Sequence, residues 1–578
     1  MKILACHVED LNVFSPPLLH VAASRELSNI QMVDLLIERG VNVSASYQEV
    51  DDERRRSTGA VIPSYAAAHI LAMGEQWWNI AALESLCKAG ADLEMTDGDG
   101  NTVLQCALNG KKSGSWGPGF WRDETLEVLL KHGANINALS PENGQTPLLV
   151  ALESRRGRKL IQKLLDCGAD INLGDTPALL EAIESEDPVA TEAVLDAGAD
   201  FNAIYHYPKQ PRNHGRGPKV ETPLLSAAMK TQGIFLRDQQ QSQDDRIAIQ
   251  ALLLKRGANP LMKLQDGDTT VLHEISRCHG LIAPIVKAGF DLEIRDSQGR
   301  TPLLAACSLT DKSYRVTEDE STTRELILAG VDVNSADNTG STPLHLAAQS
   351  GLVKTVTLLL KKGASTSAAN NAGLSPLYYA LSHSYFRLKL QPIKDLLSAG
   401  ANPLISGPNG ETPLHLLAPS LIQLAPAGSS EAETLNYGHD DKTDYLSQFK
   451  DLYQRFVGYG CDHDARDNLG NTPLFPYVEE VKHRCEYYRV NPPAEEDLRK
   501  TFDEHNVFAV NDNGDTLLHA VAGRKEDVES VPDGVWLFQE LMGRGIDPRQ
   551  ENKKGVSALD VAAACGKDKI LALFAREE

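Results

Sequence analysis

The groups of this sequence with the greatest chemical capacity are its 16 histidines and 9 cysteines. Two Cys/His pairs stand near each other, Cys461 with His463 and His483 with Cys485. Together they offer the four ligands that a zinc ion needs, but zinc sites usually leave at least two residues between the members of a pair. On a helix, a gap of one residue points the two side chains about 200° apart. The spacing argues against a metal site, and we expect no metal and no cofactor.

Catalytic motifs are missing from the sequence as well. It contains no GxxxxGK[ST] phosphate loop, no GxSxG nucleophile turn and no HExxH zinc motif. His273-Glu274 begins like the last of these, but Arg277 stands where the second histidine would be needed. The sequence therefore favours a protein that is not an enzyme. The alternative is an enzyme with its site in the least regular region, Leu446–Val510, which metal analysis and a substrate screen would test.

A recurring phrase predicts a series of helix starts. It consists of Thr, Pro and Leu, in most cases two residues after a Gly, followed by an apolar stretch rich in Ala. A threonine hydroxyl caps the free N–H groups of a helix start, and proline at the first helical position has no N–H that needs a partner. The phrase occurs at Thr146, Thr222, Thr301, Thr342, Thr412 and Thr472, with a close variant at Ser375 and a weaker one at Thr176.

A second phrase predicts the end of a second helix. It consists of two apolar residues, two or three polar ones, Gly, and often Ala-Asp or Ala-Asn, as in Leu129–Asn135. The glycine is expected to close the helix in the left-handed conformation. Twelve such glycines align: Gly40, Gly90, Gly133, Gly168, Gly198, Gly257, Gly289, Gly330, Gly363, Gly400, Gly460 and Gly545.

Together the two phrases resemble the ankyrin repeat, whose period is about 33 residues. The segments Gly340–Leu346 and Leu358–Ala364 come closest to the pattern of that family. The resemblance covers almost the whole chain and implies an all-α fold, an ankyrin-repeat solenoid of helix pairs with β-hairpin tips. About 14 repeats are expected, beginning near Ser15, Ile62, Gly100, Gly144, Asp175, Glu221, Gly267, Gly299, Gly340, Gly373, Gly410, Gly470, Gly514 and Gly555.

The repeats predict the organisation of the chain. The expected segments are 1–14, a remnant or improvised N-terminal cap; 15–266, repeats 1–6 with long inserts; 267–425, repeats 7–11, the most regular block; 426–444, a disordered insert; 445–510, an irregular repeat region; and 511–578, repeats 13–14 with a C-terminal cap. Since no cap is visible before Met1, either the chain is part of something longer or its first residues improvise one.

Polar side chains recur at two fixed places in the repeats. Five histidines hold the fourth place of the first phrase, and we predict that they bond back to the helix start: His20, His273, His345, His415 and His519. An Asp or Asn stands three residues before the turn glycine at Asp97, Asp296, Asp337, Asn370, Asp467, Asn511 and Asn552. Because such side chains stabilise turns through local backbone bonds, we interpret this row as part of the hairpins, with an acidic binding row as the alternative.

Inserts that break the period are the candidate contact sites, since insertions fall on exposed faces of a repeat array. The insert 109–123 contains Trp116, Phe120 and Trp121 among glycines. These rings could form a partner-binding cluster, or fold back over neighbouring helices. The insert 205–220 contains Arg212, Arg216 and Lys219, a basic island that could dock an acidic group or remain a solvated loop.

The charge balance limits the class of partner. Lys and Arg number 57 against 79 for Asp and Glu, a net charge of −22, which repels a phosphate backbone and excludes general nucleic-acid binding. No apolar stretch reaches the ~18 residues of a membrane span. Unpaired cysteines and the lack of a signal peptide favour the cytoplasm or the nucleus. We therefore expect protein partners, of basic character if charge decides, and no nucleic acid or membrane; the oligomeric state stays open.

The resemblance implies a protein-binding scaffold or adaptor that uses the concave groove of the array and the insert loops. A first alternative is the ligand-sensing half of a larger signalling protein that also carries an NTPase module. The second is the enzyme considered above. Membership of the ankyrin family implies recognition but names no partner.

Overall fold

The computed structural model of this chain forms two compact units, each a stack of helices. Unit 1 comprises 1–265, 270–275 and 280–290, and unit 2 comprises 266–269, 276–279 and 291–578. The structure describes residues 12, 18–24, 30–48, 64–73, 77–109, 123–142, 144–154, 158–174, 176–206, 220–229, 239–264, 268–277, 280–308, 320–382, 390–421, 444–476, 478, 495–523 and 534–574. The finer division of the chain into six segments stays a prediction.

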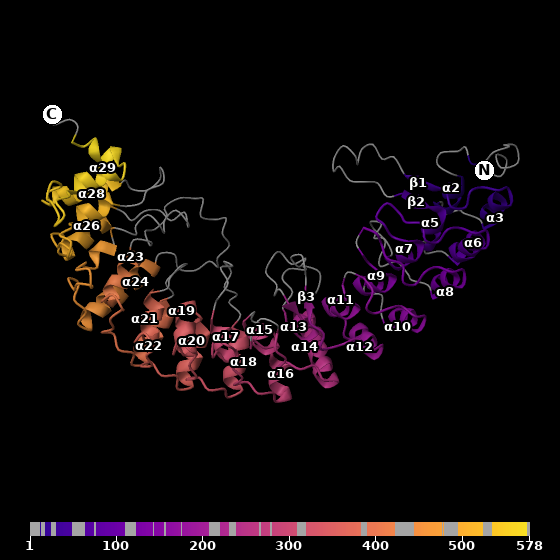
Figure 1. Ribbon diagram of the computed structural model, residues 1–578, viewed down its shortest axis with the longest axis horizontal. Coiled ribbons are helices and arrows are strands. Elements are labelled where there is room, and N and C mark those ends of the chain that lie inside the picture. Colours follow the sequence, from indigo (N-terminus) through magenta and orange to yellow (C-terminus); the bar gives the residue numbers. More distant parts are fainter. Residues whose placement is uncertain are drawn as a thin grey trace. The chain divides into compact units, whose positions relative to one another are not determined.

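In unit 1, first helices pack on first helices and second helices on second helices. Figure 1 shows α5, α7 and α9 side by side in one row, and α6 and α8 in the other. The first helices are α2 (Leu18–Ser24), α5 (Ala67–Met73), α7 (Val103–Asn109), α9 (Pro147–Glu153), α11 (Ala178–Glu184) and α13 (Pro223–Ala228). The second helices are α3 (Ile30–Glu38), α6 (Trp77–Lys88), α8 (Asp123–Lys131), α10 (Arg158–Asp166), α12 (Pro188–Asp196), α14 (Gln239–Arg256) and α16 (Ala283–Ala288).

Unit 2 repeats the same arrangement. Its helices are α17 (Pro302–Cys307), α18 (Ser321–Leu328), α19 (Pro343–Ser350), α20 (Val353–Lys361), α21 (Pro376–Ser382), α22 (Leu390–Ser398), α23 (Pro413–Leu421), α24 (Asp444–Gly458), α26 (Glu495–Glu504), α27 (Leu517–Ala522), α28 (Gly534–Gly543), α29 (Ala558–Ala564) and α30 (Asp568–Leu571). The helix α15 (Val271–Arg277) contributes residues to both units. Successive pairs such as α19 with α20 and α21 with α22 pack through buried Leu and Ala side chains.

Strands are few among the described residues, as expected for an all-α solenoid. Two antiparallel hairpins form, one from β1 (Ser46–Gln48) and β2 (Ser64–Ala66), the other from β3 (Tyr205–His206) and β4 (Val220–Glu221). The predicted fold class is confirmed, while the repeat number of about 14 stays a prediction.

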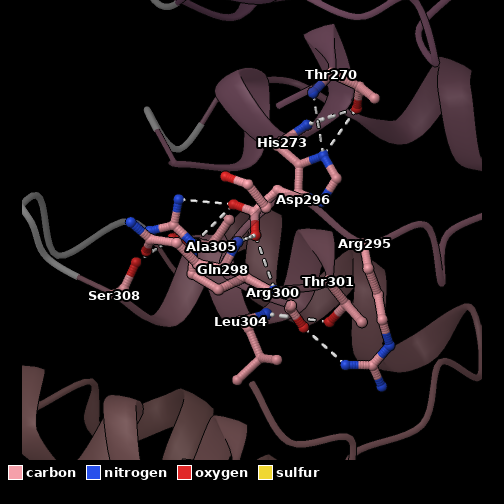
Figure 2. Close-up of polar contacts among 12 residues, drawn as sticks. Thr270, His273, Arg295, Asp296, Gln298, Arg300, Thr301, Leu304, Ala305 and Ser308 are labelled. Carbon is pink, nitrogen blue, oxygen red and sulfur yellow. Dashed lines mark hydrogen bonds and ion pairs between the residues drawn. The ribbon is translucent and has the colours of Figure 1, made fainter. Parts of the chain in front are cut away.

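The helix starts form as the first phrase predicts. The hydroxyls of Thr146, Thr222 and Thr301 accept hydrogen bonds from the backbone N–H three residues later, at 3.3, 3.2 and 3.4 Å. Figure 2 shows the bond from Leu304 to Thr301. At the weaker phrase the helix α11 begins after Pro177, with no side-chain cap. Threonine and proline thus fix where α9, α13 and α17 begin.

The glycine loops also form as predicted. All twelve aligned glycines have positive φ angles, between 75° and 104°. A second set of glycines lies at the hairpin turns, and close packing as well as a positive φ requires glycine at Gly299, Gly340, Gly410 and Gly470. A Cβ atom on Gly340 would lie 2.8 Å from the backbone nitrogen of Asn371 in the next repeat, whereas one on Gly363 would meet nothing within 4 Å.

These two glycines give a matched test of the hairpin stacking. Both have positive φ, so Gly363→Ala should cost only the strain of a left-handed alanine, about 1–2 kcal/mol. Gly340→Ala adds a backbone clash and disturbs the 2.9 Å bond from Asn371 N–H to Thr339 O, so it should cost clearly more. Chemical denaturation of the two variants measures the difference, and equal losses would contradict the close stacking.

The irregular region contains a helix where the second phrase is lost. The helix α26 runs on to Glu504 and is followed by His505 and Asn506, without the usual glycine loop. The helix forms nonetheless, and its Phe502 is 1% exposed. An apolar side chain anchors this repeat without the usual loop.

Candidate binding surface

The six predicted partner-binding residues lie outside the described residues. Trp116, Phe120 and Trp121 belong to the segment that joins α7 to α8 within one helix pair. Arg212, Arg216 and Lys219 belong to the segment that joins β3 to β4, where Tyr205 pairs with Glu221 at the base of a hairpin. Their role in binding stays a prediction. The disordered insert predicted at 426–444 likewise lies outside the described residues, except for Asp444 at the start of α24.

The row of Asp and Asn side chains holds the hairpin turns, as the sequence predicts. In the turn of Figure 2, Asp296 Oδ1 accepts from the N–H groups of Gln298 and Arg300, both at 2.9 Å. Its Oδ2 lies 2.7 Å from a guanidinium nitrogen of Arg300. Burial alone would raise the pKa of Asp296, but the hydrogen bonds and charge of Arg300 outweigh it and lower the pKa.

The same two bonds recur along the row. The acceptor side chain bonds the N–H groups two and four residues later at Asp97, Asp337, Asn370, Asp467, Asn511 and Asn552. These Asp and Asn side chains are therefore occupied with their own turns. The structural interpretation of the row is confirmed.

Of the five predicted histidines, His345, His415 and His519 join a helix start to the next repeat. His345 Nδ1 accepts from the N–H of Thr342 at 3.1 Å, and its Nε2 lies 3.0 Å from the carbonyl oxygen of Leu374 in the next hairpin. His415 and His519 repeat both contacts, and His273 bonds to Thr270. Because Nδ1 accepts while Nε2 donates, this bridge requires the neutral imidazole.

Two residues do the same work and were missed by the sequence interpretation. His69 accepts from Ala66 N–H at 3.2 Å and reaches Met95 O at 3.1 Å, although no threonine precedes it. Gln105 accepts from Thr102 N–H at 2.8 Å through its side-chain oxygen and donates to Gln145 O at 2.7 Å. The side-chain amide of Gln105 thus makes both bonds that the two ring nitrogens of a histidine make. Both residues stand three positions after the residue that precedes the helix, and this spacing could have identified them in the sequence.

Another set of side chains clamps successive repeats together at the opposite end of each hairpin. The clamp residue stands four positions after the glycine that ends the second helix, and two after an Asp or Asn. Asn334 Nδ2 donates to Gly363 O at 3.2 Å, and its Oδ1 accepts from Ser365 N–H at 2.9 Å. Asn137 and Asn202 make the same pair of bonds, while Glu94, Glu293 and Asp464 accept the second one.

A buried ion pair joins two helix pairs of unit 1, α11/α12 and α13/α14. Arg246 of α14 and Glu186, between α11 and α12, are 5% and 6% exposed, and their charged atoms lie 3.0 Å apart. Arg246 also donates to the carbonyl oxygens of Ser226 and Met229, at 2.9 and 2.7 Å, at the end of α13. Glu186 has a φ of 54°, the one positive value for a residue other than glycine among those described. On the same helix, Gln250 donates to Leu281 O at 2.7 Å.

Of the Cys/His constellation, only Cys461 and His463 lie within the described residues. Cys461 is buried, its thiol lies 3.7 Å from Pro403 O, and burial raises its pKa. His463 lies against His505, with ring centroids 5.6 Å apart. His483 and Cys485 lie outside the described residues. In the part of the chain that the structure describes, no group of three or more His, Cys, Asp or Glu side chains is arranged to hold a metal ion.

Within the described residues, no helix is both long and apolar enough to span a membrane.

Comparison with known proteins supports the repeat assignment. A family model described as "Ankyrin repeats (3 copies)" matches residues 69–175 and 313–402. The chain is 36% identical over 104 residues to Ankyrin repeat and SOCS box protein 16 of Mus musculus, which covers 18% of this chain and 23% of that protein. It is 31% identical over 148 residues to Ankyrin repeat and SOCS box protein 6 of Homo sapiens, covering 25% and 30%.

A third relative is Neurogenic locus notch homolog protein 2 of Homo sapiens, which is 29% identical over 179 residues, 26% of this chain and 7% of the relative. The chain thus matches less than a third of the length of each of these three proteins. The stacked helix pairs, the capped Thr-Pro helix starts, the left-handed glycine loops and the family match agree with one another. The chain is an ankyrin-repeat protein.

Proposed function

We propose that this chain is a protein-binding scaffold or adaptor. Ankyrin repeats indicate protein partners in general, and the relatives matched here are ankyrin-repeat proteins. The observation that carries the proposal is how the polar groups of the described repeats are used. The histidine bridges, the turn carboxylates and the clamps hold the array together, and burial raises the pKa of the thiols of Cys106 and Cys307, which makes them poor nucleophiles.

The contact surfaces of this proposal are the groove lined by the hairpins and the two inserts with Trp116, Phe120 and Trp121 and with Arg212, Arg216 and Lys219. Aromatic and arginine side chains are over-represented among the residues that dominate binding energy. The net charge of −22 favours a basic partner for the remaining surface. The cytoplasm or the nucleus is the compartment that this proposal assigns to the chain.

A second candidate is the ligand-sensing part of a larger signalling protein. In its favour, the matched segments cover only 7–30% of the lengths of these relatives, so each relative is longer than the part that resembles this chain. The length of the native transcript distinguishes this candidate from a free-standing adaptor.

Affinity purification of the tagged protein from its native locus, with mass spectrometry, tests the adaptor function. We expect a stoichiometric protein partner. A Trp116→Ala/Trp121→Ala variant tests the aromatic insert, with Arg212→Ala/Arg216→Ala as the matched change in the basic insert. Loss of the partner in one variant only assigns the contact to that insert, and retention in both assigns it to the groove. Absence of any stoichiometric partner would contradict the proposal.

A further inference from the structure

Two repeats of unit 2 lack the polar side chain that clamps one repeat to the next. At Leu404 and Phe508 an apolar residue stands in the register that Asn137, Asn202 and Asn334 use to bond the next repeat. Each stands two positions after an asparagine, as the clamp residues do after Asp or Asn. Leu404 N–H donates to Asn402 Oδ1 at 3.0 Å, and Phe508 N–H donates to Asn506 Oδ1 at 3.1 Å. The local turn is thus retained, and only the polar side chain that would reach across is lost.

The replacement brings no burial in return. Leu404 is 55% exposed and Phe508 is 60% exposed. Apolar side chains of this size are normally placed where they are removed from water, since burial is their main contribution to stability. At both positions, hydrogen bonds to the next repeat are replaced by an exposed apolar side chain. Neither replacement stabilises the fold of the chain itself.

The loops that carry these residues form one continuous edge. This loop edge consists of residues 402–404, 459–464, 503–508 and 544–549. Cys461 Sγ lies 3.7 Å from Pro403 O, and Asn506 N–H donates to Asp464 Oδ1 at 3.4 Å. The ring of Phe508 comes within 3.9 Å of the position that a Cβ would take at Gly545. Each loop therefore touches the next.

The loop edge is acidic as well as apolar. Tyr459, which is 46% exposed, is a third large exposed side chain on it. Five carboxylates belong to it (Asp462, Asp464, Asp503, Glu504 and Asp547), against the two guanidinium groups of Arg544 and Arg549. Arg544 lies 2.6 Å from Asp503, so that pair is neutral, and four carboxylates remain against the guanidinium of Arg549. Asp462 and Asp547 each accept one backbone N–H through Oδ1 and keep their negative charge. Complementary charge selects and orients a partner, while exposed apolar groups supply contact area.

We propose that the loop edge is a docking surface for a peptide segment of another protein that carries both basic and apolar side chains. The proposal rests on the adaptor function and names the chemistry of one partner. Leu404, Tyr459 and Phe508 contact the apolar side chains of that segment, and the carboxylates between them pair with its Lys or Arg residues.

The substitutions Leu404→Asn and Phe508→Asn test the surface without harming the fold. Asparagine at these positions reproduces the clamp of Asn334, so the paired variant should unfold at the same temperature as the unchanged chain or higher. The matched control is Leu328→Asn, because Leu328 is 57% exposed in the same unit but lies on α18, outside the loop edge.

The probe is a fluorescein-labelled peptide of alternating Lys and Leu, titrated with the full chain and followed by fluorescence anisotropy. Peptides of alternating Glu and Leu and of alternating Lys and Ser separate the contributions of charge and of apolar contact. We expect the Lys/Leu peptide to bind most tightly, and the paired substitution to weaken it by roughly tenfold or more, with Leu328→Asn leaving the affinity unchanged.

Two results would overturn the docking surface: equal binding of the Lys/Leu peptide to the paired variant, or equal loss in Leu328→Asn. A fall in the unfolding temperature of the paired variant would also contradict the argument, since it would mean that Leu404 and Phe508 stabilise the fold. The comparison of these variants tests only whether the peptide binds at the loop edge. The adaptor function would fail in a different experiment, through the absence of any stoichiometric partner in affinity purification.

Discussion

Replacing Arg246 by alanine should lower the free energy of unfolding by about 3–5 kcal/mol, because it leaves the carboxylate of Glu186 buried without its partner charge. The same change removes the hydrogen bonds that Arg246 donates to the carbonyl oxygens of Ser226 and Met229 at the end of α13. Denaturant titration followed by circular dichroism measures the loss. Hydrogen exchange of peptides that cover Pro223–Ala228 should place it around α13.

The control for this prediction lies on the same helix. Arg256 of α14 pairs with Asp196 at 2.7 Å, but the two side chains are 32% and 45% exposed, so Arg256→Ala should cost less than about 1 kcal/mol. Arg246→Lys keeps the charge but loses the forked geometry that reaches Glu186 and two carbonyl oxygens together, and it should fall between the two. Losses of similar size at Arg246 and Arg256 would contradict a central role for the buried pair.

Lowering the pH from 7.5 to 4.5 should destabilise the array before its carboxylates titrate. Burial, followed by the charge of His69, lowers the pKa of His20 from 6.5 to about 4. Burial also lowers the pKa values of His69, His345 and His505. As the pH falls, each of these histidines becomes protonated in the unfolded chain at a higher pH than in the folded chain.

The sign of the effect follows from proton binding. Below pH 6.5 the unfolded state binds more protons at these histidines than the folded state, so stability falls as the pH falls. The contribution is fully present above pH 6.5 and is lost progressively as the pH approaches the lowered pKa values.

His345→Gln separates this titration from other acid effects. Gln105 already occupies the same register and makes both bonds of the bridge without a titrating group. The variant should therefore be close to the unchanged chain in stability at pH 7.5 and should lose less stability between pH 6.5 and 4.5. Denaturation midpoints measured across this range test it, and an unchanged pH dependence would contradict the assignment of acid sensitivity to the bridge.

The repeat-forming contacts could be predicted from the sequence because each depends on a few neighbouring residues. Thr146 with Pro147 fixes a helix start, and Gly363 fixes a left-handed turn, through contacts with their immediate neighbours in the chain. The role of Asp296 followed from the same local logic, since its bonds reach only two and four residues ahead. These predictions needed no knowledge of how the repeats stack.

Contacts that span repeats were less accessible to prediction. Glu186 and Arg246 are separated by 60 positions, and nothing in either neighbourhood indicates that the two charges meet. His69 was missed because no threonine precedes it, although its spacing from the helix start fits the rule. The clamps of Asn137 and Asn334 needed a structure in which one repeat lies on the next. The proposed contact residues in the inserts, Trp116 and Arg212 among them, stay predictions.

The central claim is that this ankyrin array binds another protein, and the size of the native protein tests it most directly. Size-exclusion chromatography of a gentle cell extract, with mass spectrometry across the eluted fractions, reports what travels with the chain. We expect the chain to elute well above its own 62.9 kDa, together with a second protein whose elution profile matches it. Elution as a lone chain under every extraction condition, with no protein following its profile, would contradict it.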